Sequence, residues 1–254
     1  MSATSAFPRR GSALGRLTRT ELRLFVREKA GPAFAIGLPL ALLTVFGTIP
    51  YYRRHEVGGT PLLDLYVPIL CAFVLATLAF NWLPAVLAGY REKGVLRRLR
   101  TTPVGPARVL AAQLLVALAT AAVAVTALLL VARLAFGVPL PRQPYGYAAA
   151  LVLAALALMA IGLFVAAAAP HGRAANAVGA TLFYVMMFFA GLFLPIAAMP
   201  PLLRHISRAA PLGAAAQALT DAAGGRWPHP LQLITLAGYA VAFCAGAIRL
   251  FRWE

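Results

Sequence analysis

Long, almost uncharged stretches of apolar residues alternate with short polar and basic segments along most of the chain. A helix that crosses a bilayer needs about 20 such residues, and each stretch is close to or above this length. The pattern therefore predicts an all-α polytopic membrane protein in which residues 30–254 form one transmembrane domain. The six expected transmembrane helices cover residues 31–50, 63–89, 108–132, 145–169, 176–199 and 230–248.

The N-terminal residues 1–29 differ from the rest of the chain because they are polar and basic. Thr18 and Glu21 have the spacing of a capping box, which predicts a helix over about residues 19–30. The apolar face of this helix holds Leu22, Phe25 and Val26. We expect an amphipathic helix in the cytoplasmic interface, and a plain interfacial anchor would explain the same pattern.

The segment between the second and third expected spans carries five basic residues within 17 positions. Val95, Leu96 and Leu99 recur at helical spacing and predict a short amphipathic helix. This helix must stop before Pro103, because proline disfavours the helical conformation in the preceding residue. Two interpretations compete: a basic loop held on the cytoplasmic side near anionic lipid, or a docking helix that a soluble partner grips.

The fifth expected span is rich in aromatic residues and methionine, and prolines follow it. The segment from Leu202 to Trp227 is too apolar for a free loop and too often interrupted for a span. It is expected to form short helices that re-enter the membrane or lie along its outer interface, packed on protein. The residues assigned to this re-entrant segment are Pro195, Met199, Pro200 and Pro211.

Composition and charge agree with a membrane protein. The chain is 61% hydrophobic and 12% charged with a net charge of +16, whereas soluble domains average about 25% charged residues. The basic residues lie between apolar stretches, so no nucleic-acid partner is expected. With the N-terminus inside, 16 Lys and Arg residues fall on the inner side and seven on the outer side, which predicts that both termini are cytoplasmic.

The chain lacks residues that would supply its own energy or catalysis. It has no Gly-x-x-x-x-Gly-Lys motif, and its lysines, Lys29 and Lys93, follow no glycine-rich turn. The apolar stretches hold no charged relay of the kind that ion-coupled transporters use. Ser207, beside His205, lacks the setting of a catalytic serine. We therefore expect no catalytic residue, metal site or cofactor in this chain.

Two ordered sets of residues resemble type-two ABC exporter permeases, the class that exports drugs and polysaccharides. The first set is Glu92, Gly94, Leu96, Arg97, Leu99, Arg100, Thr102, Pro103 and Pro106. The second set is Gly191, Pro195, Met199, Pro200, Ile206, Pro211, Leu219 and Gly225. In this family the first set belongs to a cytoplasmic coupling helix between spans two and three. The second set belongs to the re-entrant helices between spans five and six.

The resemblance implies a membrane subunit whose energy comes from a separate ABC ATPase, with ATP and magnesium bound to two copies of that partner. The expected coupling residues are Glu92, Gly94, Val95, Leu96, Arg97, Arg98, Leu99, Arg100, Thr102 and Pro103. A second copy of the permease would pair with the first in a bacterial-type plasma membrane, surrounded by lipid. Residues expected to line the substrate path are Phe80, Trp82, Phe183, Tyr184, Met187 and Phe188.

Short loops and compact length resemble the daunorubicin and multidrug-resistance branch, so a hydrophobic drug or antibiotic is the expected cargo. Two alternatives stay open at this point. One is export of a lipid or a lipid-linked glycan by the same kind of permease. The other, from a different class, is a membrane anchor or scaffold subunit that transports nothing.

Overall fold

The computed structural model describes residues 33–92, 94, 106–194, 196 and 199–250, together with Gly15, Thr18, Arg19, Leu22 and Arg23. Side chains of the third long helix are described from Leu110 onward. Leu22 is helical and partly exposed, but Phe25 and Val26 of the predicted interfacial helix lie outside the described residues.

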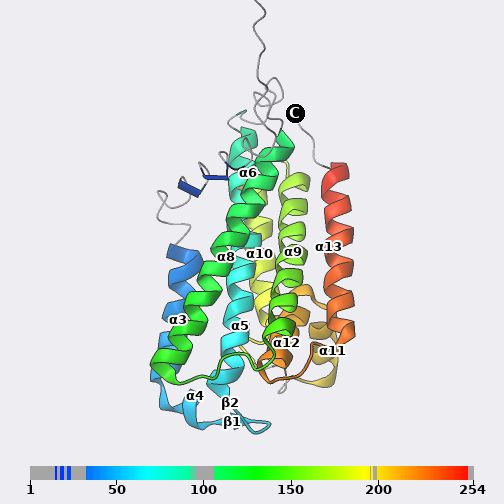
Figure 1. Cartoon of the computed structure of the whole chain (residues 1–254). Helices are drawn as coiled ribbons and strands as arrows, with labels where there is room; N and C mark the ends of the chain where they lie inside the picture. Colours follow the sequence, from blue (N-terminus) through cyan, green and yellow to red (C-terminus); the bar gives the residue numbers. More distant parts are fainter. Residues whose placement is uncertain are drawn as a thin grey trace, which may run out of the picture.

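The described residues are almost entirely helical, and their long helices run up and down side by side in one bundle (Figure 1). The elements are η1 (Ala33–Gly37), α3 (Leu38–Thr48), α4 (Pro50–Arg54), β1 (Glu56–Val57), β2 (Thr60–Pro61), α5 (Leu62–Ala76), η2 (Thr77–Trp82), α6 (Leu83–Glu92), α8 (Pro106–Phe136), α9 (Pro144–Ala168), α10 (Gly172–Ala190), α11 (Pro201–Ala209), α12 (Pro211–Ala223) and α13 (Pro230–Leu250).

Five helical segments of the described chain are long and apolar enough to cross a membrane. They are Leu62–Glu92, Leu110–Phe136, Pro144–Ala168, Gly172–Ala190 and Pro230–Leu250. A shorter apolar helix, Ala33–Thr48, lies where the first span was expected. The all-α polytopic fold predicted from the hydrophobic pattern is thereby confirmed.

The second long segment, formed by α5, η2 and α6, is the central rod of the bundle. Its most apolar window is 89% buried, against 28% for α10 and 11% for α13. It contacts α3, α8, α9, α10 and α12. Any displacement of this rod therefore affects most of the transmembrane bundle.

A π-helical turn, η2, interrupts the central rod just before Pro84. Proline has no N–H, and its ring clashes with the carbonyl four residues earlier in a regular helix. In the wider turn the Leu83 N–H donates to the Leu78 carbonyl, five residues back. The π turn thus accommodates the proline without ending the span.

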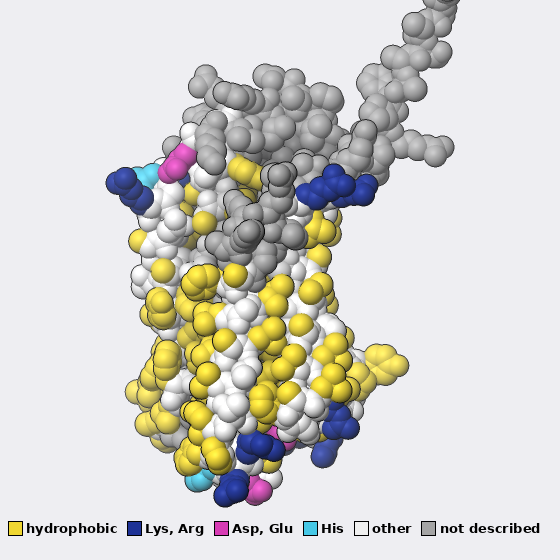
Figure 2. Space-filling view, turned by 90° about the vertical axis from the view of Figure 1, so that its left-hand side faces the viewer, with side chains coloured by type: hydrophobic (Ala, Val, Ile, Leu, Met, Phe, Trp, Pro, Cys, Tyr) yellow, Lys and Arg dark blue, Asp and Glu magenta, His cyan; other side chains and the backbone are white. Residues whose placement is uncertain are grey.

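One end of the bundle holds the hairpin of β1 and β2 together with α11 and α12, whereas α6 and α13 end at the opposite end (Figure 1). Figure 2 shows Lys and Arg side chains gathered at the two ends with a hydrophobic band between them. This distribution fits a protein that spans a membrane.

The segment after α10 forms short packed helices, as predicted. α10 ends at Ala190, nine residues before the expected end of the fifth span, because Gly191 adopts a left-handed conformation with φ +91°. α11 and α12 follow, and α12 is buried against α5, α9, α10 and α13. A short helix packed on protein keeps its backbone satisfied at this depth.

Candidate functional site

The predicted coupling segment begins where the central rod ends. Gly94 has φ +65° and its N–H donates to the Arg91 carbonyl at 3.0 Å, a geometry that terminates α6. Of the predicted coupling residues, Glu92 and Gly94 are described. Val95, Leu96, Arg97, Arg98, Leu99, Arg100, Thr102 and Pro103 lie outside the described residues. The next helix, α8, begins at Pro106, two residues before the expected start of the third span.

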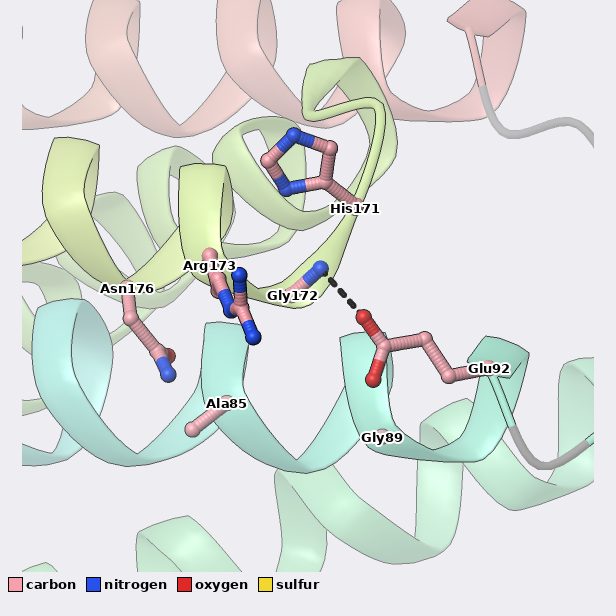
Figure 3. A pocket seen from close by; sticks show the side chains of 7 residues that line it. All are labelled: Ala85, Gly89, Glu92, His171, Gly172, Arg173 and Asn176. Atoms are coloured by element: carbon pink, nitrogen blue, oxygen red, sulfur yellow. Dashed lines mark hydrogen bonds between the residues drawn. The ribbon is translucent and has the colours of Figure 1, made fainter.

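Glu92, the last residue of α6, binds the beginning of α10. Its carboxylate Oε1 accepts a hydrogen bond from the Gly172 N–H at 2.7 Å (Figure 3). Gly172 is the first residue of α10, where N–H groups lack partners within the helix and the helix dipole is positive. The Nδ1 atom of His171 accepts from the Ala174 N–H at 3.1 Å. An anionic and a neutral acceptor thus share this helix start.

The two residues before Glu92 also connect the central rod to other helices. The Arg91 guanidinium donates to the Ala169 carbonyl, at the C-terminal end of α9. The Gln113 Nε2 atom, from α8, donates to the Tyr90 hydroxyl at 3.1 Å. Three consecutive residues of α6 therefore bind α8, the end of α9 and the start of α10. The charged pair matches the dipoles of the two helix ends that it contacts.

Small residues allow this close approach. Ala88, Ala169 and Ala175 form a buried cluster between α6 and the α9–α10 turn. A Cβ atom at Gly172 would lie 2.8 Å from the Glu92 Oε1 atom, so only glycine fits without displacing the carboxylate. The alanines thus pack the α9–α10 turn against the rod, and Gly172 leaves room for the Glu92 carboxylate.

An open hollow of about 500 Å³ adjoins the Glu92 carboxylate. It is lined by Ala85, Gly89, Glu92, His171, Gly172, Arg173 and Asn176. In Figure 3 the side chains of Arg173 and Asn176 point toward α6, with Asn176 near Ala85 on the far side of the hollow from Glu92. The hollow gives the carboxylate room to change its position without repacking the bundle.

The expected substrate-path residues do not share one environment. Phe80 and Met187 are 1% exposed and Phe183 is 8% exposed, whereas Tyr184 is 66% exposed. The Phe183 ring meets those of Phe73 and Tyr184 with centroids 5.3 and 5.4 Å apart. Trp82 and Phe188 are half-buried. Their part in substrate passage stays a prediction.

The re-entrant residues lie at the bend that follows α10. Met199 is buried, and its carbonyl accepts from the Arg204 Nη2 atom at 3.0 Å. Pro200 precedes α11, and Pro211 begins α12. Pro195 lies outside the described residues. Proline is well suited to these helix starts because it needs no N–H partner there.

Sequence reasoning missed Arg91, His171, Gly172 and Ser207 as structural contacts. Arg91 and Gly172 each bind across nearly 80 positions of sequence, and a helical pattern carries no signal at that distance. Ser207, expected as a polar residue of an interfacial helix, is fully buried and donates to the Phe189 carbonyl at 2.6 Å. Among the described residues no cluster of His, Cys, Asp or Glu could hold a metal ion.

A sequence model of the family described as ABC-2 type transporter matches residues 12–223. This match covers the predicted interfacial helix, the central rod, the coupling segment and the short helices α11 and α12. No curated protein matches the chain. Together with the bundle of apolar helices, the match shows that the chain belongs to the ABC-2 type transporter family and is a multi-pass membrane permease component of an ABC transporter.

Proposed function

We propose that this chain is the permease of an ATP-driven exporter that moves a hydrophobic, drug-like molecule out of the cell. The family implies an ABC ATPase partner, which in this proposal is a separate chain that binds ATP and magnesium. The observation that carries the proposal is the set of hydrogen bonds made by the residues just before the coupling segment. Residues 90–92 are bonded to three other helices at the point where that segment leaves the bundle.

In this proposal the ATPase receives the apolar face of the coupling helix, Val95, Leu96 and Leu99, in a groove. Arg97, Arg98 and Arg100 meet acidic residues of the partner or lipid phosphate. Closure of two ATPase copies on ATP then displaces the segment and, through the central rod, rocks the bundle between two states. The buried position of the rod supports this route because displacing it affects its neighbours directly.

The outer face of α10 supports the proposal of a hydrophobic cargo and a paired permease. This helix is the least apolar of the five candidate spans and exposes Tyr184, Thr181 and Val178. Tyrosine presents both an apolar ring and a hydroxyl, so this chargeless face suits contact with protein or with an apolar cargo that carries a polar group better than contact with lipid tails. We therefore place a second copy of the chain beside α10, with the cargo path between the copies.

A pull-down from mild detergent tests the proposal. The tagged permease should bring down a soluble chain that hydrolyses ATP, and Leu96→Asp with Leu99→Asp should abolish that association. Leu140→Asp is the matched control, because Leu140 is exposed in the connection between α8 and α9 at the opposite end of the bundle. The control should retain the ATPase.

The rate of ATP hydrolysis by the same complex, measured with candidate cargoes, identifies the cargo. Stimulation of ATP hydrolysis by hydrophobic drugs, and not by lipids, is the expected result. Stimulation of ATP hydrolysis by lipid or lipid-linked glycan alone would identify that molecule, and not a drug, as the cargo. A permease that purifies without any ATPase would contradict the proposal and favour a scaffold subunit.

A further inference from the structure

We infer that Glu92 is a positioning residue inside the permease: with Arg91, it carries the displacement of the coupling segment to the α9–α10 turn and so to α10. This inference rests on the proposed function, because it assumes that an ATPase moves residues 95–103. It changes the role of Glu92, which the sequence assigned to contact with the ATPase.

The first step is the short connection between the coupling segment and Glu92. α6 ends at Glu92, and Gly94 turns the chain immediately afterwards. Two residues therefore separate Glu92 from the predicted coupling helix. The side chain of Glu92 is already engaged, since its Oε1 atom lies 2.7 Å from the Gly172 nitrogen. A displacement of the segment reaches this bond before it reaches the middle of the rod.

The second step is the helix that receives the displacement. α10 runs 19 residues from Gly172 to Ala190, and a regular helix of this length is about 28 Å long and moves as a unit. Its far end contacts α11 and α12. A displacement at Gly172 therefore reaches Tyr184 and the short helices at the opposite end of the bundle.

The contacts of Arg91 and Glu92 are of a kind that can change during a transport cycle. Glu92 and Arg91 bind two successive helix ends through charge and backbone groups: the carboxylate binds the start of α10, and the guanidinium binds the end of α9. Such contacts can form and break without repacking side chains, unlike a close-packed core. The hollow beside the carboxylate provides space for this change.

The variant Gly172→Pro tests the inference by breaking the bond in two ways: it removes the N–H donor, and its Cβ would lie 2.8 Å from the present position of the Glu92 Oε1 atom and so displaces the carboxylate. Gly172 is the first helical residue, where proline is tolerated. His171 before it has φ −152° and ψ 167°, an extended conformation that proline permits in its neighbour. Glu92→Gln is the second variant, because it keeps an acceptor oxygen but removes the charge. Asn176→Ala, at the same hollow, is the control.

The readouts are ATPase affinity, ATP turnover and exported molecules per ATP, measured on the complete complex in vesicles. Gly172→Pro and Glu92→Gln should bind the ATPase as tightly as the wild type. Their export per ATP should fall by about tenfold, a typical size for coupling between sites. Asn176→Ala should behave as the wild type in all three measurements.

Three outcomes would overturn the inference. Unchanged export per ATP in both variants would mean that Glu92 only caps α10. Weaker ATPase binding by Glu92→Gln, with normal export per bound ATPase, would mean that Glu92 contacts the ATPase directly. A wild-type permease that binds no ATPase would overturn the proposed function as well, whereas the first two outcomes leave it standing.

Discussion

At the scale of single residues, two carbonyl groups explain where the glycines of the neighbouring helices lie. The Leu83 N–H donates to Leu78 and Pro84 has no N–H, so the carbonyls of Ala79 and Phe80 lack their regular donors. A Cβ atom at Gly162 would lie 2.0 Å from the Ala79 oxygen. A Cβ atom at Gly179 would lie 2.1 Å from the Phe80 oxygen. Glycine lets the backbones of α9 and α10 approach the π turn.

Gly162→Ala should therefore destabilise the protein by about 1–3 kcal/mol, as overpacking of a close contact does. The added methyl group meets backbone that can move only with the whole rod. Unfolding of the purified protein in detergent measures the change. Gly238→Ala in α13 is the control, since a Cβ there meets nothing within 4 Å. In an open helical position alanine is favoured over glycine by up to about 1 kcal/mol.

Equal effects of the two substitutions would contradict the close approach at Gly162. The comparison isolates packing from helix propensity, because both glycines lie inside long helices. Gly162 is buried against the Ala79 backbone, whereas Gly238 is exposed.

At the scale of elements, one hydroxyl joins the three helices at the far end of the bundle. Ser207 of α11 donates to the Phe189 carbonyl of α10, and its oxygen accepts from the Gln217 Nε2 atom of α12 at 3.4 Å. Gly213 allows α12 to pass close to Ser207, because a Cβ atom at position 213 would lie 2.1 Å from the Ser207 carbonyl oxygen. His205, two residues away, bonds to the Pro201 carbonyl. The serine thus has a structural role.

Ser207→Ala should loosen α11 from α10, at a cost of about 1–3 kcal/mol for leaving buried groups without their partner. Hydrogen exchange of the amides in residues 201–209 measures this, because local opening raises their exchange rate. Thr181→Ala is the control: its hydroxyl is exposed and bonds within its own helix, to Ala177. Unchanged exchange in Ser207→Ala would mean that packing alone holds α11 in place.

At the scale of the whole molecule, charge lies at both ends of an apolar bundle (Figure 2). The topology predicted from the sequence assigns 16 Lys and Arg residues to the side of the coupling segment and seven to the other side. Such a bias sets orientation in the membrane. Two roles for the arginines of this segment, topology and partner binding, can therefore be separated by experiment.

Arg97→Glu with Arg98→Glu should abolish ATP-coupled export while the protein still inserts in the membrane, because acidic groups would repel the acidic partner surface. Export from vesicles and protease accessibility of the two ends measure the two effects. Arg53→Glu with Arg54→Glu is matched in charge and lies in exposed α4 at the other end. Normal export by the coupling-segment variant would reduce that segment to a topology signal.

Hydropathy and proline positions predicted the long helices, but not α4, the hairpin of β1 and β2, the π turn η2 or the early end of α10. The lengths of the apolar stretches indicated long helices because lipid leaves the backbone no partner outside the helix. Prolines indicated that the segment after α10 breaks into short helices, and α11 and α12 confirm this. Sequence alone also placed the predicted coupling segment between α6 and α8, and its coupling role stays a prediction.

The arrangement of these elements came from tertiary structure, for a physical reason. Spans that are apolar on every side carry no face that marks a neighbour, since lipid and protein are equally apolar. Contacts between distant segments decide which helix is central and which carbonyl lies against Gly162 or Gly179. They also decide which helix ends bind Arg91 and Glu92. The sequence alone thus determined a helical membrane permease, whereas packing decided how residues 90–92 are joined to the rest of the bundle.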